Sequence, residues 1–357
     1  MYKILAINPG STSTKIAVYE DDKPVFQKTL RHSSQEIGEF PTVPSQFEFR
    51  KNAILSELYD AGIKSDDFDA VVGRGGVIKP IESGVYEVND ALKQDLINSR
   101  MGQHASNLGG LIAEDIAREI KGARAFIADP VVVDELDDVA RISGHPLLPN
   151  ISIFHALNQK AIGRKFAKET GKKYEELNLI IAHLGGGISV GAHKQGRIVD
   201  VNNALNGSGS FSPERAGTLP ALQLAELCFS GKYTIEEVRA MITGKGGLVA
   251  HLGTNEAHTA AARAKEGDKK ADLVLHAMAY QIAKSIGAAY AALKGKTDGI
   301  ILTGGIAYNE FVVSYIKEYI DCFGKITIYP GEDEMEALAV NALSVLKGEI
   351  ECKNYIG

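Results

Sequence analysis

Cysteine, long apolar runs and excess positive charge are all lacking in this sequence, and each lack excludes a class of protein. The three cysteines, Cys228, Cys322 and Cys352, lie far apart and form no Cys-x-x-Cys pair, which excludes a disulfide framework and a cysteine zinc site. No run approaches the roughly 18 apolar residues of a membrane-spanning helix, and the first apolar stretch is too short for a signal peptide. We therefore expect a cytoplasmic protein without a membrane partner.

The charge balance points away from nucleic acid. Lys and Arg number 39 against 45 Asp and Glu, giving a net charge of −6, whereas nucleic-acid binding requires a basic face. We expect no nucleic-acid partner. The 357 residues, 45% of them hydrophobic, are enough for two domains with buried cores.

Three common nucleotide-binding signatures are also missing. A Walker-type loop needs a glycine five residues before its Gly-Lys pair, but Tyr290 occupies that position before Gly295 and Lys296. The spaced glycines of a dinucleotide fingerprint and the protein-kinase signatures are absent too. Any nucleotide site must therefore be of another type.

What the sequence does contain is a repeated strand–turn–strand unit. Apolar residues 4–7 and 16–19 flank the small-residue turn 8–15, and residues 179–182 and 188–190 flank the glycine-rich turn 183–187. Glycine, hydroxyl groups and backbone N–H groups can hold phosphate in such turns. Pro, Gly, Ser and Thr are equally typical of an ordinary hairpin.

A third turn favours the phosphate interpretation. Thr303, Gly304 and Gly305 follow the apolar strand predicted at 299–302. Three phosphate-sized turns at strand ends indicate a nucleotide lying between two related halves of a duplicated chain. The loop predicted at 139–150 is the expected crossing between them.

Two charged residues stand at predicted strand ends. Arg74 follows a strand at 68–72 and is surrounded by Gly73, Gly75 and Gly76, which we expect to leave room for a ligand around the guanidinium. The alternative is an ordinary solvated arginine. Asp129 ends a strand at 125–128, where open α/β folds place active groups, although an Asp before proline is also a common turn residue.

Two histidines are expected at helix starts. His104 precedes a helix that Ser106 or Asn107 could cap, so the helix dipole would favour a neutral imidazole and nearby anions. His155 falls in the first turn of a helix predicted at 152–170, where a packed or surface role is the alternative. Further helices are predicted at 47–59, 271–293 and 334–346 from their apolar spacing. Arg215, again flanked by small residues, repeats the setting of Arg74.

Taken together, four motifs resemble the acetate and butyrate kinase family, which belongs to the superfamily of sugar kinases, heat-shock ATPases and actin. They are the turn 8–15, residues 183–187, residues 215–220 and residues 303–305, in order over essentially the whole chain. Pro9, Thr14 and the compact Ser-Pro-Glu-Arg segment are similar to the butyrate branch. The resemblance implies an α/β, duplicated ribonuclease-H-like two-domain fold with an interdomain nucleotide cleft. Its domains would be an acyl-substrate domain at 1–150 plus 337–357 and a nucleotide-binding domain at 151–336.

The resemblance also assigns roles, position by position. It implies catalytic roles for Asp129, His155, Arg215 and Arg74, and an acyl site formed by Arg74, Gly75, Gly76 and His104. It implies phosphate and nucleotide contacts for Ser11, Ser13, Lys15, His183, Gly185, Gly186, Gly187, Gly304, Gly305 and Asn309. Asn8 and Glu336 would hold Mg²⁺, and Glu256 with His258 would lie near the adenine.

The implied reaction is reversible, in-line phosphoryl transfer between ATP and butyrate, giving butyryl phosphate and ADP without a covalent enzyme intermediate. Gly75 and Gly76 would leave the acyl pocket open, which suits butyrate, although another short-chain or branched acid is an alternative. An actin-like binding protein without catalysis and a sugar kinase are the remaining alternatives. The family further implies a homo-oligomer, a dimer or larger.

Overall fold

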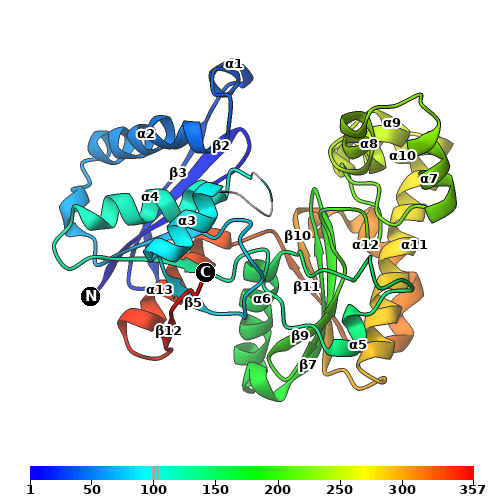
Figure 1. Ribbon diagram of the computed structural model, residues 1–357. Helices are drawn as coiled ribbons and strands as arrows, with labels where there is room; N and C mark the ends of the chain where they lie inside the picture. Colours follow the sequence, from blue (N-terminus) through cyan, green and yellow to red (C-terminus); the bar gives the residue numbers. More distant parts are fainter. Residues whose placement is uncertain (99–101, 103) are drawn as a thin grey trace. The chain divides into compact units, whose positions relative to one another are not determined.

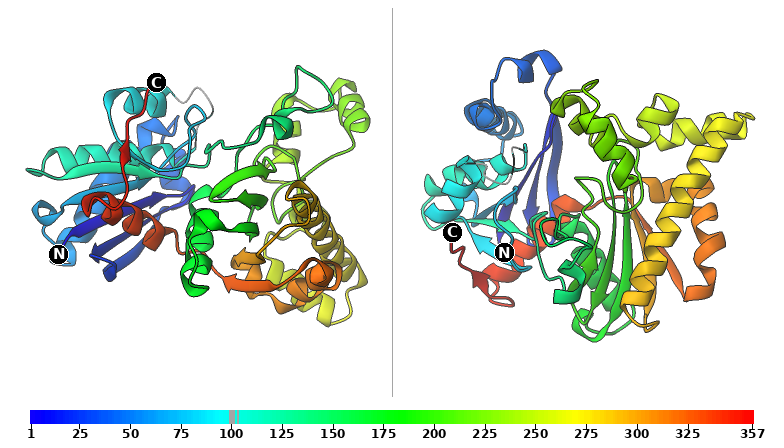
Figure 2. Two further views of the ribbon diagram at one scale, coloured as in Figure 1. Left: turned by 90° about the horizontal axis from the view of Figure 1, so that it is seen from below. Right: turned by 45° about the vertical axis from the view of Figure 1, so that its right-hand side comes forward.

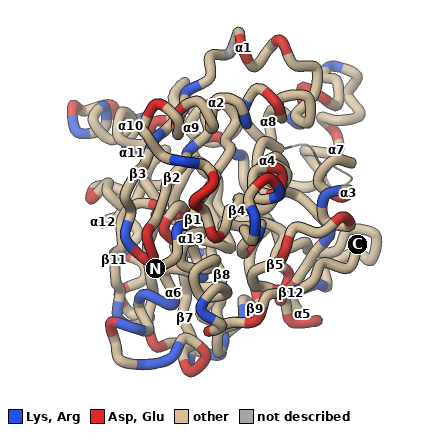
Figure 3. The backbone as a smooth tube through the Cα atoms, turned by 90° about the vertical axis from the view of Figure 1, so that its left-hand side faces the viewer, with Lys and Arg blue, Asp and Glu red and all other residues tan. Residues whose placement is uncertain are grey.

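The computed structural model describes residues 1–98, 102 and 104–357 (Figure 1). This part of the chain forms two compact units, Met1–Val133 together with Asp333–Gly357, and Asp134–Glu332. Basic and acidic residues are mixed along both units (Figure 3). No helix among the described residues is long and apolar enough to cross a membrane.

The first unit is built on a seven-stranded sheet in the order β12-β5-β6-β4-β1-β2-β3. β1 pairs antiparallel with β2 and parallel with β4, and β6 pairs parallel with β4. Helices α2 and α4 cover one face and α13 the other (Figure 2). The strands are β1 (Lys3–Pro9), β2 (Ser13–Glu20), β3 (Lys23–Arg31), β4 (Ala70–Arg74), β5 (Val85–Glu87), β6 (Arg124–Ala128) and β12 (Cys352–Lys353), and the helices are α1 (Ser34–Gly38), α2 (Phe47–Asp60), α3 (Asp90–Asn98), α4 (Asn107–Arg118) and α13 (Glu334–Leu346).

The second unit has a five-stranded sheet in the order β11-β10-β7-β8-β9. Alternate residues of β7 face two cores: Ile180 and Ala182 pack in the cluster with α11 and α12, and Leu179 and Ile181 pack with Phe166 of α6. The strands are β7 (Asn178–Leu184), β8 (Ile188–Lys194), β9 (Arg197–Val201), β10 (Gly299–Gly304) and β11 (Ile326–Pro330), and the helices are α5 (Asp138–Arg141), α6 (Ala156–Glu169), α7 (Ala221–Phe229), α8 (Ile235–Ile242), α9 (Gly247–Leu252), α10 (Ala257–Lys265), α11 (Lys269–Ala292) and α12 (Glu310–Ile320).

The two sheets repeat one topology. The order β3-β2-β1-β4-β6 in the first unit corresponds to β9-β8-β7-β10-β11 in the second. In both, the first three strands are antiparallel and the next two are parallel. The predicted α/β fold with an internal duplication is therefore confirmed.

Several local predictions are wrong. The helix expected from Ser152 begins at Ala156, with His155 as its N-cap. Ser106 is the N-cap residue of α4, as one of the two alternatives predicted, but its side chain makes no cap bond, and Asn107 Oδ1 accepts from the Val77 N–H at 2.9 Å.

The loop expected at 139–150 contains the end of α5, and the segment before it belongs to the second unit. Asp137 N donates to Val199 O at 2.9 Å, and Glu135 accepts from Lys160. The compact units accordingly divide at Val133, before the predicted boundary at 150.

Candidate active site

In the first unit, one group of polar side chains gathers at the ends of β1 and β4 and at the start of α13. Asn8 and Arg74 end neighbouring strands, and Glu334 begins the helix. Arg74 contacts the Glu334 carboxylate through both terminal nitrogens. Nη1 is 3.2 Å from Oε2, and Nη2 is 3.1 Å from Oε1. Asn8 Nδ2 donates to the same carboxylate at 2.5 Å. Asn8 and Glu334 are both buried, so this pairing is shielded from solvent.

The sequence analysis missed Glu334, which is the first-turn glutamate of α13 that contacts Asn8 and Arg74. A magnesium contact for Glu336 stays a prediction. Glu336 is exposed, one half-turn further along α13. Its charge and that of Asp333 add to the effect of burial, which raises the pKa of Tyr19 to about 12. Apolar spacing located the helix, but it could not distinguish two glutamates in the first turn.

The turn between β1 and β2 rests on a buried arginine. Arg50 of α2 is fully buried and donates to Ser13 O at 2.9 Å, to Ser11 O at 3.1 Å and to Thr14 Oγ1 at 3.0 Å. Arg50 Nε also donates to Gln46 Oε1 at 3.0 Å. The guanidinium therefore fixes the turn on which Ser11, Ser13 and Lys15 lie.

The sequence analysis did not single out Arg50. The available signal was its position four residues before Ile54, on the apolar face of the predicted helix. Burial lowers the pKa of Arg50, and burial together with the Arg50 charge lowers the pKa of His32, which contacts Thr14 at 2.9 Å.

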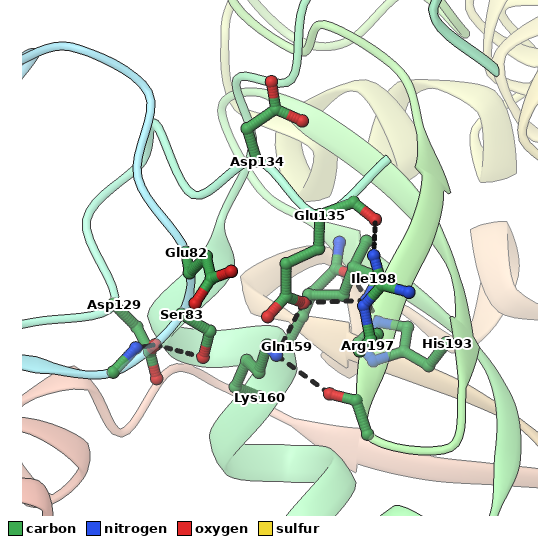
Figure 4. A network of polar contacts seen from close by, with 12 residues as sticks. Glu82, Ser83, Asp129, Asp134, Glu135, Gln159, Lys160, His193, Arg197 and Ile198 are labelled. Carbon is green, nitrogen blue, oxygen red and sulfur yellow. Dashed lines mark hydrogen bonds and ion pairs between the residues drawn. The ribbon is translucent and has the colours of Figure 1, made fainter. Parts of the chain in front are cut away.

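Asp129 is held in an unusual backbone conformation directly after β6. Its φ is +38°, which is rare for a residue other than glycine. Oδ1 accepts from Ser83 Oγ at 2.6 Å and from Gly84 N at 2.9 Å (Figure 4). The carboxylate is buried, so it is a fixed group at a strand end and not a solvated turn residue.

The glycines around Arg74 do not serve the purpose that we expected. A Cβ on Gly73 would lie 2.1 Å from Gly109 O, one on Gly75 would lie 2.6 Å from Pro130 Cβ, and one on Gly76 would lie 2.4 Å from Asn107 Oδ1. The space is filled by neighbouring residues, so the glycines allow close packing of β4. The argument that they open the acyl pocket is wrong, and an acyl contact for Gly75 and Gly76 stays a prediction.

His104 lies beside the start of α4, as expected. Its Nδ1 is 2.8 Å from Ser106 Oγ, and its carbonyl accepts from the Asn107 N–H at 2.9 Å. The imidazole is exposed, but residues 99–101 and 103, which precede it, lie outside the described part of the chain. Its role in an acyl site stays a prediction.

In the second unit, two predicted histidines stack. The rings of His155 and His183 are 3.8 Å apart and inclined by 13°. His183 is buried, with Nδ1 2.8 Å from Asn158 Oδ1 and Nε2 3.0 Å from Glu332 Oε1. His155 Nδ1 is 2.9 Å from Ser189 Oγ. The start of α6 is thus joined to the turn between β7 and β8.

Arg215 lies against the same turn. A Cβ on Gly187 would lie 1.9 Å from Arg215 Nη1, so only glycine leaves the guanidinium its place. Arg215 Nη1 donates to Ala204 O at 2.5 Å, and Ser212 Oγ donates to Gly186 O at 2.6 Å. His155, His183 and Arg215, predicted separately, are therefore brought together around one turn.

Four of the residues predicted near the nucleotide line a cavity of about 590 Å³ in the second unit. Gly305 and Asn309 come from the segment after β10, and Glu256 and His258 come from the start of α10. Gly304 has φ +89°, and a Cβ there would lie 2.4 Å from Leu184 O. The volume is within the range of small-molecule sites.

The comparisons with known proteins agree with this architecture. The sequence profile of the acetokinase family matches residues 153–332. A probable butyrate kinase of Bacteroides thetaiotaomicron is 57% identical over 353 residues, and butyrate kinase 2 of Clostridium acetobutylicum is 56% identical over 354 residues, each match covering 99% of both chains. The chain belongs to the acetokinase family.

Solved structures support the fold. The acetate kinase of Porphyromonas gingivalis superimposes with a TM-score of 0.76 at 19% identity, covering 97% of this chain and 100% of that one. A propionate kinase of Francisella tularensis gives a TM-score of 0.75 at 16% identity, covering 96% and 99%.

Proposed function

We propose that this protein is a butyrate kinase, which transfers a phosphoryl group reversibly between ATP and butyrate. The observation that carries the proposal is the match of 56–57% identity, over 99% of this chain and 99–100% of each relative, to proteins named butyrate kinase or probable butyrate kinase. Those relatives match the chain from end to end, so the groups around Arg74 and around the β7–β8 turn both fall within the similarity.

In the first unit, Arg74 would bind the carboxylate of the acid. Its planar guanidinium already makes a two-nitrogen contact with a carboxylate, that of Glu334, which is the geometry that an acid substrate would require. His104 would line the acyl chain. Asp129, fixed by Ser83 and Gly84, would orient the neighbouring polar groups.

In the second unit, the β7–β8 turn would hold the phosphates and the cavity beside α10 would hold the adenosine. Arg215 and His155 would donate hydrogen bonds to the phosphoryl oxygens, where negative charge must be neutralised during transfer. In the first unit, Ser11, Ser13 and Lys15 would add hydroxyl and ammonium donors for phosphate.

The residues present fit Mg²⁺. Among the described residues no group of three or more His, Cys, Asp or Glu side chains could hold a metal, but Mg²⁺ in kinases needs only one or two carboxylates beside phosphate and water. The amide oxygen of Asn8 and the carboxylates of Glu334 and Glu336 are oxygen ligands of the right kind. When bound, Mg²⁺ supplies charge neutralisation on the phosphates.

A homo-oligomer and a cytoplasmic location also belong to the proposal. Every residue of α7 has an accessible side chain, including Leu222 at 68% and Phe229 at 91% exposure, and such an apolar surface favours association. The free cysteines are consistent with a reducing compartment. Sedimentation velocity tests the oligomer, and a monomer at assay concentration would contradict it.

The proposed reaction is tested by incubating the purified protein with ATP, Mg²⁺, butyrate and hydroxylamine. Hydroxylamine traps an acyl phosphate as a coloured hydroxamate. We expect butyryl hydroxamate in an amount equal to the ADP formed. A non-catalytic nucleotide-binding protein gives neither product, and a sugar kinase gives ADP only when a sugar is added.

A further inference from the structure

We propose that Ser189 and Gln159 are positioning residues that hold neutral His155 in one tautomer, with its proton on Nε2. The proposal concerns a chain of buried hydrogen bonds that runs from Tyr174 to His155 within the second unit. Its mechanistic consequence rests on the proposed function, but the tautomer itself does not.

The hydrogen bonds between Tyr174 and His155 follow one another without a break, and the atoms are closely spaced. Tyr174 Oη is 2.6 Å from His193 Nδ1, and His193 Nε2 is 2.9 Å from Gln159 Oε1. Gln159 Nε2 donates to Ser189 Oγ at 2.8 Å, and that hydroxyl is 2.9 Å from His155 Nδ1. Gln159, Ser189 and His193 are fully buried, so water does not compete with these bonds.

A backbone carbonyl determines which group donates and which accepts in each of these hydrogen bonds. Gln159 Nε2 also lies 3.2 Å from Ser189 O, which can only accept, so the amide nitrogen must face this carbonyl. The amide oxygen therefore faces His193 Nε2, which must carry a proton. His193 and Gln159 lie side by side in Figure 4.

His193 is neutral, so its Nδ1 accepts from Tyr174. Burial lowers the pKa of His193 well below its ordinary value, and the charge of Lys160 adds to this effect. Lys160 is itself held in place, 2.8 Å from Glu135 Oε2 and 2.9 Å from Gly196 O (Figure 4).

The Ser189 hydroxyl in turn determines which nitrogen of His155 carries the proton. A hydroxyl accepts two hydrogen bonds and donates one. Ser189 Oγ accepts from Gln159 Nε2 and faces the His155 backbone N–H at 3.5 Å. Within the described chain, the acceptor left for the hydroxyl proton is His155 Nδ1. A neutral His155 then carries its own proton on Nε2.

Packing holds this arrangement in place. A Cβ on Gly191 would lie 2.5 Å from Gln159 Oε1 and 3.1 Å from His193 Nε2, so the backbone of β8 passes close to the amide. The His183 ring stacks on His155 and restricts its rotation. In this tautomer, under the proposed function, His155 would donate to a phosphoryl oxygen through Nε2–H, without adding charge.

The direct test is the ¹⁵N NMR spectrum of histidine-labelled protein without substrates, at a pH above the ordinary histidine range. Long-range ¹H–¹⁵N correlations show which ring nitrogen carries the proton, and the His155→Gln variant assigns the signals. We expect a pyridine-like Nδ1 and a protonated Nε2 for His155. A pyridine-like Nε2, or equal populations of the two tautomers, would overturn the proposal.

Three variants test which residues fix the tautomer. Ser189→Ala should leave His155 with mixed tautomers and lower kcat by about 10²-fold, the usual loss for one aligned donor, with KM for ATP and butyrate changed by less than about threefold. Gln159→Glu should reverse the tautomer, because a carboxylate oxygen in place of the amide nitrogen accepts the hydrogen bond of the Ser189 hydroxyl, which then accepts from Nδ1–H of His155. Tyr174→Phe, a control at the far end, should leave the tautomer unchanged because the Ser189 carbonyl still fixes the amide.

These outcomes separate this proposal from the proposed function. If the wild-type protein had no kinase activity, the proposed function would be contradicted, but the proposed tautomer of His155 would not. An active enzyme whose His155 signals and kcat do not change in Ser189→Ala contradicts the positioning role.

Discussion

The Arg215 guanidinium lies in the space that a side chain on Gly187 of the β7–β8 turn would fill, and its Nη1 donates to Ala204 O. At the scale of single residues, the proposed function requires this guanidinium to neutralise a phosphoryl group. An arginine of this kind contributes about 10³ to 10⁵ in rate.

Arg215→Ala should therefore lose at least about 10³-fold in kcat, because charge neutralisation matters most in the transition state. KM for ATP should change little. Steady-state kinetics measure both values, and Arg239→Ala on α8 serves as the control. Near-normal turnover would remove Arg215 from the mechanism.

The two glutamates of the first turn of α13 make a second test. Glu334 is buried against Asn8 and Arg74, whereas Glu336 is exposed. Glu334→Gln should raise the Mg²⁺ concentration needed for half-maximal activity more than Glu336→Gln does, because it removes the buried carboxylate. Mg²⁺ titrations of both variants measure this. The reverse order would restore Glu336 as the ligand expected from the sequence.

His193 should make stability depend on pH. Its pKa is lowered well below 6.5 in the folded protein, so below that pH the unfolded chain binds one more proton than the folded chain. The free energy of unfolding should fall with decreasing pH, by about 1.4 kcal/mol per pH unit for this one proton.

Urea denaturation of wild type and His193→Gln between about pH 7 and pH 5 measures this contribution. The variant should have the shallower slope, retaining the contribution of His32, whose pKa is also lowered. Parallel curves would show that His193 titrates normally in the folded protein.

At the scale of elements, the turn between β1 and β2 depends on a residue from α2. Arg50 supplies donors to two turn carbonyls and to Thr14, and lysine cannot reproduce this planar arrangement. Arg50→Lys should destabilise the protein by about 1–3 kcal/mol and raise KM for ATP. Urea denaturation and kinetics measure both.

Asn52→Ala, an exposed substitution on the same helix, is the matched control and should change stability by less than about 0.5 kcal/mol. If Arg50→Lys were equally silent, the turn would hold its shape without the guanidinium.

The elements also show what the sequence could and could not predict. The helices α2, α11 and α13 followed from apolar spacing, because each has one face in a core, and the strands around each small-residue turn followed from continuous apolar runs, because strands such as β7 are buried on both faces. The start of α6 did not, since Ser152 looks like a cap while His155 is the N-cap. The glycines beside Arg74 showed that small residues were needed, but only the contacts of Gly75 with Pro130 and Gly76 with Asn107 revealed why.

Buried polar partners were the least predictable. Glu334, Gln159 and Ser189 are ordinary residues in sequence, and their contacts join segments far apart in the chain. No local pattern encodes such pairings. His183 and Arg215 stand beside small residues and His155 stands at a predicted helix start, and the family resemblance drew attention to all three.

At the scale of the whole molecule, the duplicated topology and the match to acetokinase relatives along the whole chain support a single activity, phosphoryl transfer to a short-chain acid. Because the glycines beside Arg74 are packed against neighbours, the preference for butyrate rests on the relatives and not on a visible opening. One methylene is worth about 1–3 kcal/mol in an apolar pocket.

The measurement that tests the central claim most directly is kcat/KM for acetate, propionate, butyrate, isobutyrate and valerate in the hydroxamate assay. We predict that butyrate exceeds acetate by at least about tenfold, with propionate and valerate between them. A clear preference for acetate would contradict the assignment as a butyrate kinase, and the absence of acyl phosphate from every acid would contradict the proposed activity altogether.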